Sequence, residues 1–323
     1  GWYRKHFDID STLLSSGKRI YLDFDGVYML SEVFVNGHST GIRPYGYISF
    51  RRDITPYLQA GTNVVAVRVD NSEQPNSRWY SGCGIYRHVW IVTVAPIHVD
   101  LWGTYVTTPE INDSQATVNV ATRLRNSLQE KAEVKVCQYI LDADDKTVAY
   151  ADCLMTVPAD TTAESSLRLT LKAPRRWSID DPYLYTVRTQ IIADGQTIDS
   201  YDSPLGIRTF RFDAEKGFFL NEKPVKIKGV CMHHDLGCLG AAVNERAIER
   251  QLEMLKAMGC NAYRCSHNPP APEVLDLCDR MGLIVMDESF DMWRKRKTTY
   301  DYSRFFNEWY EKDLTDLVMR DRN

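Results

Sequence analysis

Apolar and polar residues alternate with a period of two along the first 96 residues, in short runs separated by turn residues. A strand with one buried face produces this period, and no helix-period segment interrupts the series. The dipeptide Asn36-Gly37 is typical of a tight hairpin. The pattern predicts an all-β jelly-roll sandwich over residues 1–96, with its first strands outside the sequence. The expected strands are residues 20–24, 33–35, 50–58, 64–69 and 89–94.

The alternation continues after Pro96 to residue 211. Turns recur roughly every 10 residues, and a segment of about 110 residues is the usual size of an immunoglobulin-like domain. We therefore expect an immunoglobulin-like β-sandwich over residues 97–211. Its clearest strands are residues 116–120, 132–136, 167–171 and 185–189.

After Gly217 the chain changes to strands that alternate with helices. Residues 225–230, 261–265 and 283–286 are expected to be strands, and the last is continuously apolar, as in a parallel sheet buried on both faces. Asn244 caps one helix and Pro272 begins another. Repeated βα units predict the N-terminal part of a (β/α)8 TIM barrel over residues 212–323, with about three of its eight strands.

Composition narrows the classes of function. The formal net charge of -4 leaves no basic field for a polyanion, so nucleic acid is not an expected partner. No apolar stretch is long enough to span a membrane. The eight cysteines form no C-x-x-C pair, which argues against a zinc knuckle or a thioredoxin-like motif. We expect these cysteines to be free and mostly buried.

Polar side chains follow each of the three expected barrel strands. In a TIM barrel the active site lies at these carboxyl ends, and a sugar needs a hydrogen-bond partner for each hydroxyl. A polar cluster that reaches these ends from three consecutive strands is what a sugar site needs. Its members are His233, His234, Arg264, His267, Asp287 and Glu288.

Alternatives exist for several members of this cluster. Arg264 could instead form a structural salt bridge, for example with Asp287, and the turn before Pro269 could account for His267. Arg264 and His267 share a pocket only if the strand ends or bulges near residues 265–266, because residues three apart on a strand face opposite sides. His233 and His234 point apart for a similar reason, which disfavours a shared metal ion.

Five short strings, in order, carry a resemblance to glycoside hydrolase family 2. They are D-I-T-P-Y-L at 53–58, S-G-C-G-I-Y-R at 81–87, F-F-L-N-E-K-P at 218–224, N-A-Y-R-C-S-H-N-P at 261–269 and M-D-E at 286–288. The resemblance covers essentially the whole chain. It makes residues 1–96 a sugar-binding domain and the barrel segment the start of a catalytic domain.

The resemblance also implies roles for particular residues. It makes His233 and His267 hydrogen-bonding residues of the terminal-sugar subsite, and Arg264 the cation that keeps the nucleophile ionised. Trp79 is implied at the barrel mouth, where plain packing between domains is the alternative. Asn268, Asp287 and Glu288 complete the expected substrate-binding set.

Neither catalytic carboxylate is expected within the sequence. In the family the acid/base and the nucleophile follow later barrel strands, so both are expected beyond Asn323. Asp287 and Glu288 are adjacent on one strand, and they cannot flank a glycosidic bond at the ~5–5.5 Å separation of a retaining enzyme. The 323 residues alone are therefore expected to be inactive.

The implied activity is that of a retaining exo-β-glycosidase, specifically a β-galactosidase acting on terminal β-D-galactosides of oligo- or polysaccharides. A β-glucuronidase of the same family is the alternative, and a non-catalytic carbohydrate-binding β-sandwich protein is a rival of another class. No cofactor is assigned; the resemblance leaves Mg²⁺ or Na⁺ and a homo-oligomer open for the intact enzyme. Localisation also stays open between the cytoplasm and the periplasm or exterior of a bacterium.

Overall fold

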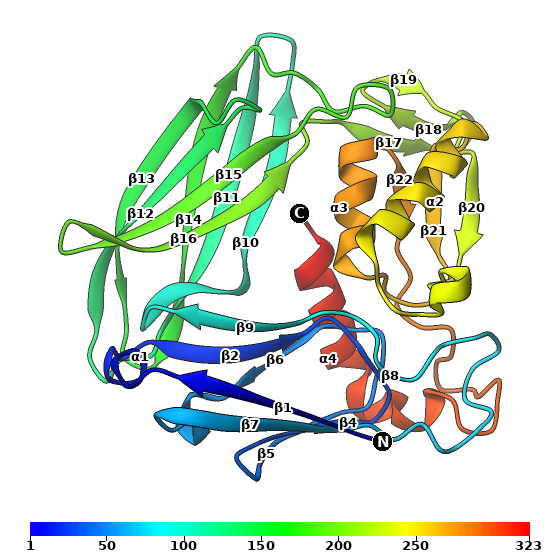
Figure 1. Cartoon of the computed structure of the whole chain (residues 1–323). Helices are drawn as coiled ribbons and strands as arrows, with labels where there is room; N and C mark the ends of the chain where they lie inside the picture. Colours follow the sequence, from blue (N-terminus) through cyan, green and yellow to red (C-terminus); the bar gives the residue numbers. More distant parts are fainter. The chain divides into compact units, whose positions relative to one another are not determined.

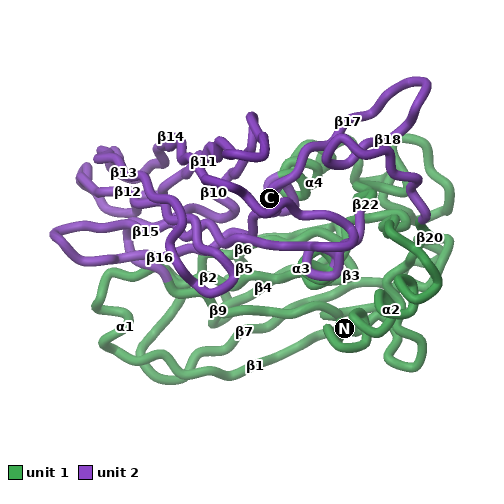
Figure 2. The backbone as a smooth tube through the Cα atoms, turned by 90° about the horizontal axis from the view of Figure 1, so that it is seen from above, with its two compact units in different colours: residues 1–93, 229–277, 285–318 green, residues 94–228, 278–284, 319–323 purple.

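The computed structural model describes all 323 residues, and the chain divides into two compact units. Unit 1 comprises residues 1–93, 229–277 and 285–318, and unit 2 comprises residues 94–228, 278–284 and 319–323 (Figure 2). The first sandwich therefore shares a unit with the barrel strands that follow much later in the sequence.

The first part of unit 1 is a sandwich of two sheets, in strand orders β1-β7-β4-β5 and β6-β2-β9, with the short pair β3-β8 (Figure 1). The pairs β1-β7, β7-β4, β4-β5, β2-β6 and β3-β8 are antiparallel. The strands are β1 (Trp2–Ile9), β2 (Arg19–Phe24), β3 (Val27–Tyr28), β4 (Ser31–Val35), β5 (His38–Arg43), β6 (Phe50–Asp53), β7 (Gly61–Arg68), β8 (Gly84–Ile85) and β9 (Val89–Val94).

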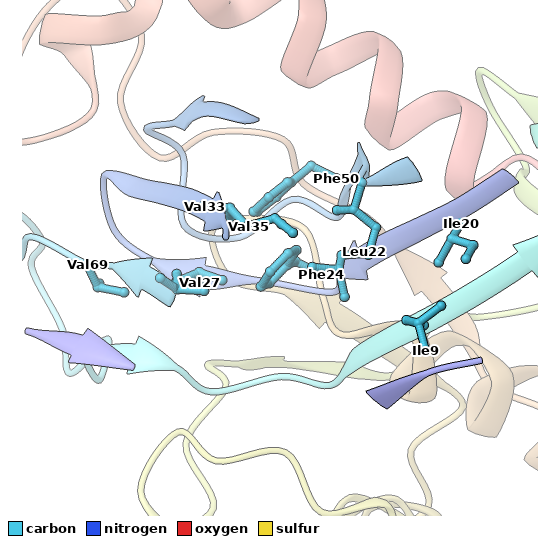
Figure 3. Packing of buried hydrophobic residues seen from close by; sticks show 11 residues of the cluster. Ile9, Ile20, Leu22, Phe24, Val27, Val33, Val35, Phe50 and Val69 are labelled. Atoms are coloured by element: carbon cyan, nitrogen blue, oxygen red, sulfur yellow. The ribbon is translucent and has the colours of Figure 1, made fainter. Parts of the chain in front are cut away.

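Strict alternation in β2 builds the core of this sandwich. Ile20, Leu22 and Phe24 are buried while the residues between them are partly exposed. Figure 3 shows these side chains meeting residues of other strands, and the Phe24 and Phe50 rings stack with centroids 4.9 Å apart. Burial of large apolar side chains such as these stabilises a fold by roughly 1.5–3 kcal/mol each.

Two local predictions for this sandwich were wrong. Residues 50–58 do not form one strand: β6 ends at Asp53, and the 3-10 helix η1 (Thr55–Tyr57) follows. The Asp53 carboxylate accepts a hydrogen bond from the Thr55 backbone N–H at 3.0 Å, and Pro56 has no N–H to donate, so a turn forms. A five-residue helix, α1 (Ser11–Ser15), also interrupts the strands, capped by Asp10.

Unit 2 consists mainly of the second sandwich. One sheet has the order β10-β11-β14 and the other the order β13-β12-β15-β16. A small antiparallel sheet, β17-β18-β19, follows. The strands are β10 (Ile97–Ile111), β11 (Gln115–Asn126), β12 (Ala132–Leu141), β13 (Thr147–Val157), β14 (Thr161–Lys172), β15 (Tyr185–Ala193), β16 (Gln196–Leu205), β17 (Phe210–Asp213), β18 (Gly217–Leu220) and β19 (Lys223–Pro224).

The rest of unit 1 contains the sheet β20-β21-β22, in which β20 and β21 pair in parallel. The helix α2 is capped by Asn244, as predicted, and buries Ile248, Leu252 and Leu255. The elements are β20 (Gly229–Met232), η2 (Gly237–Leu239), α2 (Glu245–Ala257), β21 (Ala262–Cys265), α3 (Pro272–Met281), β22 (Ile284–Met286) and α4 (Ser303–Asp321). The boundary between the units crosses α3, β22 and α4.

Two predictions for the barrel segment need correction. The strand expected over residues 225–230 begins only at Gly229, because the backbone N–H of Val225 bonds the carbonyl of Phe218 and keeps this stretch beside β18. The strand β22 is not buried on both faces, since Met286 is 59% exposed. In the strand order of this sheet, β22 has a neighbour on one side only.

All eight cysteines are free, as predicted, but most are not buried. Cys137, Cys265 and Cys278 are buried, whereas Cys83, Cys231 and Cys238 are exposed. None of the helices is sufficiently long and apolar to cross a membrane.

Candidate functional site

The carboxyl ends of β21 and β22 bring three of the predicted site residues into one hydrogen-bonded group. Arg264 forms an ion pair with Glu288 through its Nε atom. His267 Nδ1 lies 2.9 Å from the other carboxylate oxygen of Glu288 and 3.3 Å from an Arg264 guanidinium nitrogen. The strand β21 ends at Cys265, so Arg264 and His267 reach the same carboxylate. The salt bridge considered for Arg264 therefore forms with Glu288.

Two further rings, those of Trp79 and His233, lie beside this group. The Trp79 ring centroid is 5.0 Å from that of His233 and 5.4 Å from that of His267. The two imidazole centroids are 5.6 Å apart. Burial and the neighbouring His267 lower the pKa of His233, so this imidazole is neutral near pH 7. A neutral imidazole can both donate to and accept from a sugar hydroxyl.

His234 faces different neighbours from His233. Its ring centroid lies 4.7 Å from that of Tyr47 and 6.2 Å from that of Tyr86. Burial, with the charge of Arg87, holds the pKa of His234 well below its usual range. The two adjacent imidazoles thus contact separate sets of rings, and His234 is a packing residue behind the cluster.

Asn268 lies at the floor of the same region and is 2% exposed. Neither its amide nitrogen nor its amide oxygen has a hydrogen-bond partner within the chain. It lines a pocket of about 30 Å³ together with Trp79 and His267, which is room for roughly two water molecules. A buried amide without partners costs about 1–3 kcal/mol, so we expect water or a ligand hydroxyl to satisfy it. Asp287, the remaining predicted residue, is half-buried.

Two ion-pair connections fix the loop that carries Trp79. Arg78 makes a two-pronged contact with Asp291, at 3.1 Å and 2.5 Å, and Lys297 contacts the same carboxylate at 2.8 Å. Glu73, earlier in the loop, pairs with Arg304. Although burial alone would raise it, Arg78 and Lys297 hold the pKa of Asp291 below its usual value. These contacts connect the first sandwich to the segment after β22.

Sequence reasoning missed two participants. The Cys231 thiol accepts a hydrogen bond of 3.1 Å from Arg264, and this contact, with Ser266, lowers the pKa of Cys231. A signal was available, because Cys231 lies in β20, two residues before the predicted site residue His233. Asp291 was also missed, and nothing local in the sequence marks it, since its partner Arg78 is 213 residues away.

Comparison with protein families gives three consecutive matches. Residues 1–95 match the sugar-binding domain of the glycosyl hydrolases family 2, residues 97–208 match the domain described as "Glycosyl hydrolases family 2", and residues 213–322 match the family's TIM barrel domain. The chain belongs to glycosyl hydrolase family 2. Membership confirms the fold class expected from the sequence: a jelly-roll sandwich, an immunoglobulin-like sandwich and the first part of a TIM barrel.

Relatives in family 2 include enzymes with two named specificities. The chain is 59% identical over its whole length to a β-galactosidase of Bacteroides ovatus, of which it spans 38%. It is 31% identical over 84% of its length to a β-glucuronidase of Bacteroides fragilis, of which it spans 41%. A crystal structure of a family 2 member from Bacteroides cellulosilyticus matches the whole chain with a TM-score of 0.97 and 45% identity, and the chain covers 41% of it. The chain thus spans less than half of each of these relatives.

Stability should fall in mild acid because of His234. Its pKa in the folded state lies well below the ordinary value of 6.5. The unfolded chain therefore binds this proton first, and the contribution of neutral His234 to stability is complete above about pH 6.5 and is lost as pH falls below it. Melting temperatures between pH 7 and pH 5 should decline less steeply in His234→Gln than in the unaltered protein. The exposed His38 gives the control, His38→Gln; equal slopes in all three proteins would contradict the assignment.

Proposed function

We propose that the whole enzyme containing this chain is a retaining exo-β-glycosidase, specifically a β-galactosidase that releases terminal β-D-galactose. The observation that carries the proposal is the convergence of Arg264, His267, Glu288 and His233 at the ends of three neighbouring strands of a family 2 barrel. Trp79, from a loop of the first sandwich, lies beside them. The 59% identity to a β-galactosidase favours galactose as the sugar. A carbohydrate is thus the proposed partner.

Arg264 is proposed to orient and ionise the nucleophile. Its side chain is 37% exposed, so the guanidinium is accessible to a further carboxylate from outside these residues. Glu288 and Cys231 hold the guanidinium in place. A nearby guanidinium lowers the pKa of a carboxyl group, which keeps a nucleophilic carboxylate charged.

His233, His267 and Asn268 are proposed to bind the hydroxyls of the terminal sugar, with Trp79 packing against its apolar face. The unpartnered amide of Asn268 and the neutral imidazole of His233 supply donors and acceptors. An aromatic ring suits the C–H face of a pyranose because it is flat and apolar. Asp287 is proposed to line the pocket floor next to Glu288.

A β-glucuronidase is the second candidate, supported by relatives with that name. A glucuronide carries a carboxylate that needs a cation. Arg78 and Lys297 already pair with Asp291, and the carboxylate that Arg264 is proposed to meet besides Glu288 is the nucleophile. This charge balance favours the neutral galactoside.

A comparison of two substrates distinguishes a β-galactosidase from a β-glucuronidase. The whole enzyme is expected to hydrolyse nitrophenyl β-galactoside with a kcat/KM at least about 100-fold above that for nitrophenyl β-glucuronide, because a carboxylate without a partner would be desolvated. Proton NMR during hydrolysis should show the β-anomer of the sugar first. A preference for the glucuronide, or an initial α-anomer, would refute the specificity or the retaining mechanism respectively. Absence of turnover with any glycoside, together with sugar binding, would favour a carbohydrate-binding protein.

The 323 residues alone are predicted to hydrolyse no aryl β-glycoside. We place the acid/base and the nucleophile in later barrel strands, and each contributes orders of magnitude to the rate. Release of nitrophenol from nitrophenyl galactoside should equal that of a buffer blank, with protein purified from a host that lacks β-galactosidase. Turnover well above the blank would show that a carboxylate within these residues, such as Glu288, takes part in the chemistry.

A further inference from the structure

Three side chains with metal-ligating atoms gather in unit 1 away from the sugar cluster. Asp25 follows β2, His88 precedes β9, and Glu273 lies in the first turn of α3. One ligand atom from each lies within 4.8 Å of the other two. The closest pair is His88 Nδ1 and a Glu273 carboxylate oxygen, 2.5 Å apart. A single ion could contact all three atoms after small side-chain movements.

The surroundings hold this group in place. Trp90 Nε1 donates a hydrogen bond of 2.9 Å to one oxygen of the Asp25 carboxylate, which orients the other. The backbone N–H of Asp25 bonds the carbonyl of His88 at 3.0 Å, so two of the three residues are tied together by the sheet. The Glu273 side chain is 15% exposed. Its second carboxylate oxygen is buried and has no hydrogen-bond partner. The group therefore contains an acceptor that no residue of the chain satisfies.

Two carboxylates and one guanidinium are the charged groups to compare around this cluster. The Asp25 carboxylate accepts the Trp90 hydrogen bond and lies close to the carboxylate of Glu273. Arg87 is the neighbouring cation, but its guanidinium donates to the backbone carbonyls of Asp25, Tyr47, Pro269 and Pro270. Two carboxylates in a half-buried site can accommodate a dication despite this guanidinium.

We propose that Asp25, His88 and Glu273 bind a divalent transition-metal ion of the Zn²⁺ type. One imidazole and two carboxylates are ligands that Zn²⁺ accepts, and three protein ligands leave a fourth tetrahedral position for water. The hydrogen bond from Trp90 fixes the Asp25 carboxylate in the way that outer-shell donors orient metal ligands. The ion would join strands of the first sandwich to α3 and stabilise the folded protein through binding. This site is separate from the proposed sugar site.

The test is zinc binding by the whole protein after removal of metals with a chelator. Isothermal titration with Zn²⁺ should give a binding event that His88→Ala and the isosteric Glu273→Gln each weaken by about 100-fold, and that Trp90→Phe weakens by about 10-fold. His38→Ala, which removes an exposed histidine from the same sandwich, should leave the affinity unchanged. Zn²⁺ should raise the melting temperature of the unaltered protein and of His38→Ala but not of His88→Ala.

Cobalt distinguishes this site from the exposed cysteines. Co²⁺ bound at Asp25, His88 and Glu273 should give visible d–d bands without a thiolate-to-metal charge-transfer band, because all three ligand atoms are nitrogen or oxygen. Zinc affinity that persists in both His88→Ala and Glu273→Gln, or a thiolate band, would assign the metal to other residues and overturn the proposal. Absence of zinc binding in the folded, unaltered protein would also overturn it, leaving His88 and Glu273 as an ion pair between α3 and the sandwich.

Discussion

Replacing Arg264 by alanine in the whole enzyme should lower kcat by on the order of 100- to 1,000-fold while the protein stays folded. The guanidinium is expected to act on the nucleophile as its charge changes toward the transition state, and losing such an electrostatic contact typically costs this much. The measurement is kcat per active site, titrated with a mechanism-based inhibitor, together with a melting curve. Arg68, an exposed arginine that pairs with Asp70, gives the matched control Arg68→Ala.

If Arg264 has only a structural role, the expected result is different. Arg264→Ala would then melt early, and the molecules that remained folded would turn over at the normal rate. His267→Ala adds a second comparison, because a sugar hydroxyl contact acts in both the ground state and the transition state. It should raise KM and lower kcat together. Normal kcat in Arg264→Ala would leave only the ion pair with Glu288 as the role of this residue.

Replacing Asp313 by alanine should lower the free energy of unfolding by about 3–5 kcal/mol, the usual cost of removing one partner from a buried ion pair. Asp313, in α4, forms an ion pair with Arg43 of β5 and accepts a hydrogen bond from the Tyr302 hydroxyl. The Arg43 side chain is 1% exposed, so the substitution leaves a charge that water cannot reach. Arg43 keeps its second partner, Asp316, at 2.8 Å, but the buried Tyr302 hydroxyl loses its acceptor. Urea unfolding followed by tryptophan fluorescence measures the change.

Two variants of α4 sharpen this test. Asp313→Asn keeps a hydrogen-bond acceptor for Tyr302 and removes the charge, so its loss of stability should fall between those of the unaltered protein and Asp313→Ala. Glu308 is exposed on the same helix, and Glu308→Ala should change the unfolding free energy by less than about 0.5 kcal/mol. A loss below about 1 kcal/mol in Asp313→Ala would mean that water or Asp316 compensates Arg43.

The parts of the fold that were predicted correctly are those in which burial follows a short period. The alternation of apolar and polar residues predicted β2 correctly. The cap residue Asn244 and the apolar face that follows it predicted α2. Each of these signals lies within a few residues of sequence. Residues 225–228 alternate as a strand does, yet their position depends on Phe218 in a neighbouring hairpin. The exposure of Met286 depends on which strands flank β22, which periodicity does not encode. The domain boundaries at residues 96 and 211 stay predictions.

The residues of the candidate site also divide into those with a local sequence signal and those without one. Arg264 and His267 were placed together because both lie at the end of one strand, and the structure brings both to Glu288. The contact of Arg78 with Asp291 had no local signal, since a charged residue in a loop resembles any solvated residue until its partner is known. The cysteines as a set were expected to be mostly buried, whereas Cys231 is exposed and hydrogen-bonded to Arg264.

The ion pairs that hold the Trp79 loop restrict how the domains of such enzymes can be exchanged. Arg78 and Glu73 belong to the first sandwich, while their partners Asp291 and Arg304 follow the third barrel strand. A chimaera that joins this sandwich to a barrel without partners at the positions of Asp291 and Arg304 would lose both pairs. Its tryptophan would then lose the anchors that set its distance from His233 and His267. Exchange of this sandwich is therefore expected to keep the Trp79 ring beside His233 and His267 only when the segment after β22 is transferred with it.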